Sequence, residues 1–454
     1  MMLFTTNWLS TIFSTNKGNI REEFVIETVN RDSRVKAKNS LFIPIVGENF
    51  DGHDFVTQAH ENGAVAVLWE SSKELPKDLS NELIVYYVDD TTKALQELAS
   101  HYRDEVNPIV VGVTGSNGKT STKDIIASIS KEKFKTHSTN GNYNNEIGMP
   151  LTILSMARDT EILVLEMGMS SFGEIELLSK IAKPDYAIIT NIGESHIEFL
   201  GSREGIAKAK LEITSGLKEN GRVIIDGDEE LLSHVHQQDN VLSVGFGSEN
   251  DYVISNIDLN RNETVFTGSD GNSYGIPLLG THNAKNASFG IVLASLLGIE
   301  TEQVQHALRN LTLSGMRFEM LYGKNGVSII NDAYNASPTS MRAAIQVVKQ
   351  LNGYREKILV LGDIYELGSQ SVSMHESVAE VIDQSISALY TIGEDSQAIS
   401  SIVKSKYPKM RVKHFNDKED VLEPLNQYLN QDSLILFKAS RGMKLESLIV
   451  AIND

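Results

Sequence analysis

Short apolar runs separated by helix-like segments recur along the chain. The first clear ones are residues 41–46 and 64–69, with a helical pattern from about Asp54 to Asn62 between them. Such runs are typical of buried strands, and strands that alternate with helices indicate parallel sheets. The pattern therefore predicts an α/β protein.

The alternation is divided into three stretches. Asn107-Pro108 breaks the first, because proline pushes the residue before it out of the helical region. Further apolar runs lie at residues 109–113, 161–167, 186–190 and 222–226, and then at 327–332, 357–363, 388–393 and 434–440. We therefore predict three domains, 1–107, 108–316 and 317–454, the second built on a parallel sheet and the third on a doubly wound Rossmann-like sheet.

Composition excludes several classes of function. The chain of 454 residues suits two to four domains and carries 41 basic against 60 acidic residues, a net charge of −19. Nucleic-acid binders need a basic face, so we expect no such partner. No apolar run approaches the length of about 18 residues that a membrane span needs. The absence of cysteine excludes thiolate chemistry and fits a reducing cytoplasm, where we expect the chain to act as a monomer.

A glycine-rich turn follows the strand predicted at 109–113. It reads Thr114-Gly115-Ser116-Asn117-Gly118-Lys119-Thr120 and opens a helix. Backbone amides in such a turn hold phosphate oxygens, the lysine reaches the terminal phosphates, and the threonine hydroxyl suits Mg²⁺. The match to the strict motif is incomplete, since Val113 occupies the place of the first glycine. A turn without a ligand is the alternative.

This turn resembles the phosphate loop of the Mur ligases and of the related folylpolyglutamate synthetases, and the resemblance extends over essentially the whole chain. It implies an N-terminal domain that binds a UDP-linked substrate, a central ATPase-like domain and a C-terminal Rossmann-like domain. It also implies ATP and two Mg²⁺ ions as cofactors.

Two side chains after predicted strands are candidate metal ligands. Glu166 ends the run at 161–167, and a carboxylate at the carboxyl end of a strand suits Mg²⁺. His196 follows the run at 186–190; a lone histidine is more often structural, but the resemblance implies a ligand of the second metal ion. A solvated glutamate is the alternative for Glu166.

Lys210 lies in a helix-like pattern and by itself suggests a surface lysine. The resemblance implies that CO₂ converts its amine to a carbamate that faces Mg²⁺, so that Lys119, Glu166, His196 and Lys210 form the catalytic set. An ammonium would be repelled by the metal ions, and burial and nearby cations favour the neutral amine that carbamylation needs. Lys208 is two residues away and does not share that helix face.

Candidate nucleotide-binding residues lie on both sides of the second domain boundary. His282, Asn283 and Asn286 match a family motif, and the Asn283 amide suits an adenine edge. Capping of a helix by Thr281 or Asn283 is the alternative. The resemblance places Arg317 on the ATP phosphates, which suits a forked, permanently charged group, although an exposed surface arginine has the same sequence appearance.

The segment after residue 330 adds two more candidates. Asp332 is expected at the ribose or the phosphate–metal cluster, and Tyr334 against the nucleotide. Asp332 ends the run at 327–332 and Tyr334 follows it, at the strand end where ligands gather.

Candidate substrate-binding residues lie in polar loops. The resemblance suggests the UDP moiety for Ser33, Arg34, Gly52 and His53. The amides of Asn142, Asn144 and Asn145 suit a peptide or a sugar, although asparagines also favour plain turns.

Within the family, Asn335-Ala336-Ser337-Pro338 most resembles the ligase that joins D-alanyl-D-alanine (D-Ala-D-Ala) to UDP-N-acetylmuramoyl-tripeptide (UDP-MurNAc-tripeptide) through an acyl phosphate, in peptidoglycan precursor synthesis. Those two molecules are then the implied substrates. A sibling ligase that adds the third residue to UDP-MurNAc-dipeptide lacks support, because no Asp-Asn-Pro-Arg segment occurs. A folylpolyglutamate synthetase would lack the extra N-terminal domain. An ATP-gated binding module is the non-enzymatic alternative, and its ATP turnover would not respond to an acceptor.

Overall fold

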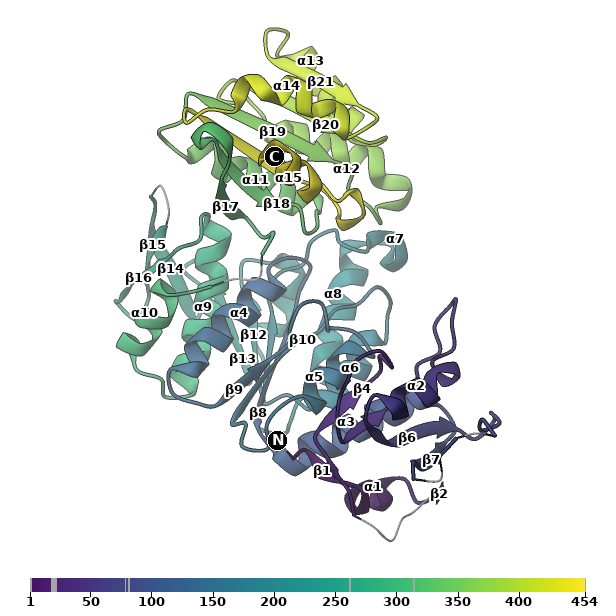
Figure 1. Cartoon of the computed structure of the whole chain (residues 1–454). Coiled ribbons are helices and arrows are strands. Elements are labelled where there is room, and N and C mark those ends of the chain that lie inside the picture. Colours follow the sequence, from purple (N-terminus) through teal and green to yellow (C-terminus); the bar gives the residue numbers. More distant parts are fainter. Residues whose placement is uncertain are drawn as a thin grey trace.

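Three α/β domains follow one another along the molecule (Figure 1). The computed structural model describes residues 2–17, 23–77, 79–80, 82–260, 263–312 and 315–453. The N-terminal domain lies beside one end of the central domain, and the C-terminal domain lies beyond the other end (Figure 1). Among the described residues, no helix is long and apolar enough to span a membrane. The predicted three-domain α/β class is confirmed, and the boundaries after residues 107 and 316 stay predictions.

The N-terminal domain is built on a five-stranded sheet in the order β2-β7-β6-β5-β4, with β1 and β3 paired beside it. The strands are β1 Phe4–Thr5, β2 Asn16–Lys17, β3 Val25–Ile26, β4 Thr28–Asn30, β5 Ser40–Phe42, β6 Ala64–Glu70 and β7 Ile84–Val88; the helices are α1 Thr6–Ile12, α2 Val56–Glu61 and α3 Thr91–Val106. The strand expected at 41–46 ends at Phe42, two residues before Pro44, which cannot donate a ladder hydrogen bond. Helix α3 ends at Val106, and its C-cap Asn107, with φ 51°, precedes Pro108 at the predicted break.

The central domain holds a nine-stranded sheet in the order β16-β15-β14-β13-β12-β11-β8-β10-β9. Its strands are β8 Ile109–Thr114, β9 Thr136–Ser138, β10 Ile162–Glu166, β11 Tyr186–Ile189, β12 Arg222–Asp226, β13 Val241–Gly245, β14 Tyr252–Leu259, β15 Thr264–Gly268 and β16 Ser273–Ile276. Its helices are α4 Lys119–Lys131, α5 Gly148–Leu154, α6 Glu174–Ala182, α7 Ile197–Leu200, α8 Arg203–Leu211, α9 Thr281–Leu296 and α10 Thr301–Arg309. The predicted strands β8, β10, β11 and β12 are parallel, and so are β9, β13 and β14, which were not predicted. Strands β15 and β16 are antiparallel, because their short connections leave no room for a crossover.

The C-terminal domain carries a six-stranded sheet in the order β17-β18-β22-β19-β20-β21. The strands are β17 Glu319–Tyr322, β18 Ser328–Asp332, β19 Glu356–Gly362, β20 Ala388–Ile392, β21 Arg411–Phe415 and β22 Ser433–Lys438; the helices are α11 Pro338–Gln350, α12 Ser371–Val378, α13 Gln397–Lys406, α14 Leu422–Leu425 and α15 Glu446–Asn453. All pairs except β17–β18 are parallel. Strand β21 was not predicted, because charged residues interrupt its apolar pattern.

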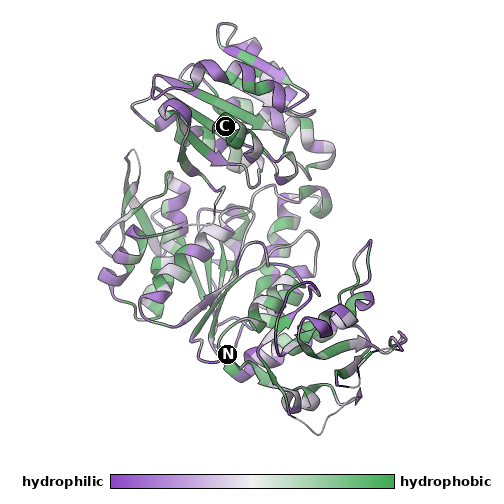
Figure 2. Ribbon diagram, viewed as in Figure 1, coloured by the Kyte–Doolittle hydropathy of each residue, from purple (hydrophilic) through white to green (hydrophobic). Residues whose placement is uncertain are grey.

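The apolar strands form the centre of each domain, as their hydropathy shows (Figure 2). In the central sheet β8 lies between β10 and β11, with Val113 opposite Glu166 and Thr114 opposite Ile189. Three segments therefore emerge at one edge of the sheet: the phosphate loop after β8, the end of β10, and the loop after β11. This is where parallel sheets place their ligands.

Candidate active site between the central and C-terminal domains

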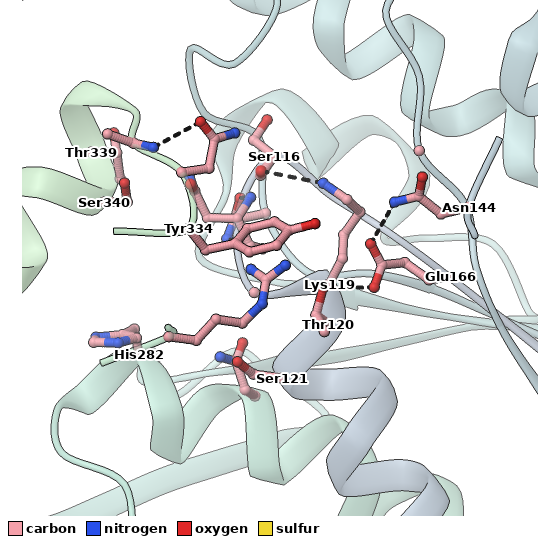
Figure 3. Close-up of a pocket in the computed structure, with 18 of the residues that line it drawn as sticks. Ser116, Lys119, Thr120, Ser121, Asn144, Glu166, His282, Tyr334, Thr339 and Ser340 are labelled. Carbon is pink, nitrogen blue, oxygen red and sulfur yellow. Dashed lines mark hydrogen bonds between the residues drawn. The ribbon is translucent and has the colours of Figure 1, made fainter. Parts of the chain in front are cut away.

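A cavity of about 510 Å³ opens at this edge, and both the central and the C-terminal domain line it. Lys119, Thr120, Glu166 and Asn144 lie on one side of the view, His282, Thr339 and Ser340 on the other, and Tyr334 between them (Figure 3). The structure thus gathers residues that are more than 200 positions apart in the chain, such as Asn117 and Ser337.

The phosphate loop is held in shape by the segment that follows β11. Gly115 has φ 148°, and a Cβ there would lie 1.9 Å from Thr190 Oγ1. The Asn117 carbonyl accepts hydrogen bonds from Thr190 Oγ1 at 2.6 Å and Asn191 Nδ2 at 3.0 Å. Thr114 lies beneath the loop, where its hydroxyl donates to the Met167 carbonyl. Only glycine fits at 115, so the curl of the loop depends on this residue.

Polar atoms of the loop remain available to a ligand. Ser116 Oγ and Asn117 Nδ2 are buried and have no hydrogen-bond partner among the described residues. Helix α4 begins at Lys119 after Gly118 and has no side-chain cap, so its first amides are also available. Because buried polar atoms are normally paired, this arrangement fits phosphate oxygens.

Lys119 is anchored within the loop by its own backbone. Its Nζ donates to the Gly115 carbonyl at 2.8 Å. Burial lowers the pKa of Lys119, as does Arg317, while Glu166 opposes the shift. A phosphate here would gain a hydrogen-bonded cation in a poorly hydrated place.

Glu166 and Thr120 form an oxygen-rich pair that fits Mg²⁺. Glu166 is 2% exposed; Thr120 Oγ1 donates to its Oε2 and Asn144 Nδ2 to its Oε1, both at 2.7 Å. Hydroxyl and carboxylate oxygens are ligands that Mg²⁺ prefers. In the described part of the chain no cluster of three His, Cys, Asp or Glu side chains could hold a metal ion, so other oxygens would have to complete the coordination.

Lys210 on α8 is a buried lysine, not the surface lysine that its segment suggests. It is 2% exposed, and within the described chain its side chain has no hydrogen-bond or ion-pair partner. Burial, and then the nearby Lys119, lowers the pKa of Lys210 well below its usual value. This shift favours the neutral amine that reacts with CO₂, although Lys210 does not itself line the cavity.

His196 does line the cavity. It precedes α7 with φ 65°, and its Nδ1 lies 2.5 Å from Oε2 of Glu366 in the C-terminal domain. A predicted metal ligand of one domain thus contacts a carboxylate of the next.

The start of α9 packs against the phosphate loop. His282, Asn283 and Asn286 all line the cavity, and a Cβ on Gly118 would lie 2.8 Å from Asn286 Oδ1. Asn283 Nδ2 donates to the Leu279 carbonyl. Gly280 is the residue at the cap, with no side-chain cap bond, so neither Thr281 nor Asn283 caps this helix.

The C-terminal domain contributes Arg317, Asp332 and Tyr334. The Arg317 guanidinium lies 4.0 Å from the centroid of the Tyr334 ring, which is cation–π geometry. Asp332 accepts hydrogen bonds from the Phe318 amide at 3.1 Å and from Lys438 Nζ at 2.6 Å. Arg317 is therefore part of the cavity wall and not an isolated surface arginine.

Lys438 lines the cavity and was missed as a candidate. It is 2% exposed and lies opposite Asp332 in the pairing of β18 with β22. The available signal was a lysine at the carboxyl end of a buried strand.

The candidate substrate residues are only partly in this place. Asn144 and Asn145 line the cavity, whereas Asn142 is exposed outside it. The N-terminal candidates lie in their own domain, where each already has local contacts. These are Ser33 with Gln58, Arg34 with Asp32, Gly52 against Ile45, and His53 with Asp51.

The architecture and this site define the class of protein. Models of the Mur ligase family match in chain order: the catalytic domain of the Mur ligase family at residues 25–103, the Mur ligase middle domain at 113–294, and the Mur ligase glutamate ligase domain at 316–441. The chain belongs to the Mur ligase family, as the sequence motifs predicted.

Individual relatives narrow this further. The chain is 48% identical over 431 residues to UDP-N-acetylmuramoyl-tripeptide–D-alanyl-D-alanine ligase of Bacillus subtilis (strain 168). The aligned region covers 94% of this chain and 93% of the relative. The chain is similar to the crystal structure of MurF from Acinetobacter baumannii, with a TM-score of 0.85 and 29% identity. The match covers 99% of this chain and 98% of that chain. It is also similar to MurF ligase from Thermotoga maritima in complex with ADP (TM-score 0.82, 30% identity, 94% and 96%).

Proposed function

We propose that this protein joins D-Ala-D-Ala to UDP-MurNAc-tripeptide at the expense of ATP, in peptidoglycan precursor synthesis. The observation that carries the proposal is the 48% identity, over 94% of the chain, to a relative named for this reaction. The cavity supports it, because a buried phosphate loop, an oxygen pair for a divalent cation and an interdomain location are what such a ligase needs.

ATP would bind across the two domains. The phosphate-loop amides, Ser116 Oγ and Lys119 would hold the phosphates, and Arg317 would reach them from the C-terminal domain. Asn283 would meet the adenine edge, with His282 and Asn286 beside it, while Asp332 and Tyr334 would contact the ribose and base.

Two Mg²⁺ ions are part of this proposal. Thr120 and Glu166 would hold the first, and His196 with a carbamate on Lys210 would hold the second. When bound, the ions would neutralise phosphate charge and stabilise the oxyanion that develops on the acyl carbon.

The reaction would proceed in two transfers. The terminal carboxylate of the tripeptide attacks the γ-phosphorus in line, which gives an acyl phosphate and ADP. The amine of D-Ala-D-Ala then attacks the acyl carbon, phosphate leaves and an amide remains. Because an acyl phosphate hydrolyses in water, we also propose that the C-terminal domain closes over ATP.

The substrates can be tested directly. Phosphate release from ATP and Mg²⁺ should depend on both UDP-MurNAc-tripeptide and D-Ala-D-Ala, and mass spectrometry should find the pentapeptide product. Release that needs a single amino acid in place of the dipeptide would point to the sibling ligase. Release indifferent to any acceptor would point to an ATP-gated binding module.

We further propose that the enzyme works as a monomer in the cytoplasm. Sedimentation of the active enzyme as a dimer would contradict the first part of this proposal.

A further inference from the structure

The loop of residues 363–368, after β19, contacts the central domain where that domain carries His196. Oε2 of Glu366 lies 2.5 Å from His196 Nδ1. The backbone carbonyl of the same glutamate accepts a hydrogen bond from the Glu198 amide at 3.2 Å. One residue of the C-terminal domain thus makes two contacts with one short segment of the central domain.

The backbone at both ends of this contact is unusual. Glu366 has φ 62° and His196 has φ 65°, in the left-handed region that residues other than glycine rarely adopt. Such conformations persist where the surrounding structure holds them, and they cluster at functional sites. The surrounding structure therefore holds both residues in this contact at the interface between the two domains.

The chemistry of imidazole gives this contact a consequence. His196 lines the cavity, and its buried Nδ1 forms no hydrogen bond within the described chain although it lies 2.5 Å from Oε2 of Glu366. With a carboxylate that close to Nδ1, Nε2 is the nitrogen left for a ligand. Histidines that bind metals commonly present their second nitrogen to a carboxylate, which sets the tautomer and the ring orientation.

We propose that Glu366 is a positioning residue for His196: it orients the imidazole so that Nε2 faces the cavity, and it does so from the other domain. The inference rests on the proposed function in one respect, namely that His196 binds the second divalent ion. It follows that metal affinity at His196 depends on docking of the C-terminal domain, and by reciprocity that the metal favours docking.

Mn²⁺ binding to the full-length enzyme tests this. Mn²⁺ replaces Mg²⁺ as a paramagnetic probe, and titration with a non-hydrolysable ATP analogue, without acceptor, counts the ions by electron paramagnetic resonance. Wild type should bind two. Glu366→Gln should weaken the second ion about tenfold or more and leave the first unchanged. Glu376→Gln, an exposed glutamate of α12 in the same domain, is the matched control and should bind like wild type.

A cycle with His196→Ala separates positioning from general damage. His196→Ala should weaken binding of the second ion, and adding Glu366→Gln to it should cost nothing more, since Glu366 acts through His196. Thermal unfolding of each variant, without metal, checks that the fold is intact.

The outcomes are decisive. Wild-type affinity for both ions in Glu366→Gln, or a loss of equal size in the His196→Ala background, would overturn the inference. A single ion in wild type would overturn it together with the second metal site. Two ions with the expected Glu366 effect, but no pentapeptide from D-Ala-D-Ala, would uphold the inference and refute the proposed substrates instead.

Discussion

Lys210 shows how a single residue acquires chemistry from its surroundings. Sequence context makes it an ordinary helical lysine, yet it is 2% exposed, without a partner in the described chain, and close to Lys119. An ammonium in that position is poorly solvated and repelled, so the neutral amine is favoured.

The lowered pKa of Lys210 should make the free energy of unfolding depend on pH. The folded-state pKa of Lys210 lies well below its unfolded value, so the unfolded state binds more protons between the two. In CO₂-free buffer, wild type should therefore lose stability relative to Lys210→Met as pH falls from about 10, by up to about 1.4 kcal/mol per pH unit, and level off below the folded pKa. Urea unfolding at several pH values measures this. Lys208→Met, at an exposed site, should show no such trend. A pH-independent difference for Lys210→Met would contradict the assignment.

The same amine should be the site of carbamylation. Activity of wild type should fall in CO₂-depleted buffer and return with bicarbonate, whereas Lys210→Ala should be inactive in both. Native mass spectrometry should find one added CO₂ in wild type and in Lys208→Ala, and none in Lys210→Ala. An active Lys210→Ala variant would rule the carbamate out.

Arg317 depends on its shape as well as its charge. It lies 4.0 Å from the Tyr334 ring centroid and lines the cavity. Arg317→Lys keeps the charge but loses the planar fork, so we expect KM for ATP to rise roughly tenfold. Steady-state kinetics measure the change, with Arg309→Lys on the exposed side of α10 as control. An unchanged KM would remove Arg317 from the phosphate site.

At the scale of elements, α11 joins the two domains through its first turn. Ser337 caps the helix by accepting from the Ser340 amide at 3.1 Å, and its hydroxyl donates to Asn117 Oδ1 of the phosphate loop at 3.0 Å. The cap and the contact between the domains therefore share one side chain.

Two substitutions at Ser337 should separate these roles. Ser337→Ala loses both, so we expect about 1 kcal/mol less stability and a higher KM for ATP. Ser337→Asp keeps a capping acceptor but cannot donate to Asn117, so stability should stay near wild type while KM still rises. Chemical unfolding and steady-state kinetics supply the two readouts. Equal KM values for Ser337→Asp and wild type would show that the Asn117 contact is not used.

At the scale of the whole molecule, Glu194 is a second point of docking between the domains. It accepts from the Thr339 amide at 3.2 Å, from Thr339 Oγ1 at 2.8 Å and from Arg342 at 3.3 Å. Its side chain is 13% exposed, so the charge is only partly screened.

Loss of the Glu194 contacts should weaken the docking of the C-terminal domain on the central domain. With ATP analogue and UDP-MurNAc-tripeptide, small-angle scattering should find a more compact wild type and less compaction in Glu194→Gln. Arg342→Met should couple to Glu194→Gln by about 0.5–3 kcal/mol in a double-mutant cycle on nucleotide affinity. Glu230→Gln, exposed in the same domain, should behave as wild type. Absence of compaction in wild type would refute domain closure itself.

Local sequence determined much of this protein. The phosphate loop, the strand ends at Glu166 and Asp332, and the α/β class could be predicted because buried strands and their following turns depend on neighbours along the chain. The same locality explains the errors. The antiparallel β15 and β16 and the short β5 depend on connection lengths and on Pro44, which the apolar pattern does not register.

Tertiary structure alone decided how these parts act together. It pairs Lys438 with Asp332, places Glu366 against His196 and Ser337 against Asn117, and buries Lys210 next to Lys119. No local pattern encodes such contacts, because they join positions distant in the chain and, in two cases, different domains. Burial and charge proximity exist only once the chain has packed, and they determine which lysine has its pKa lowered.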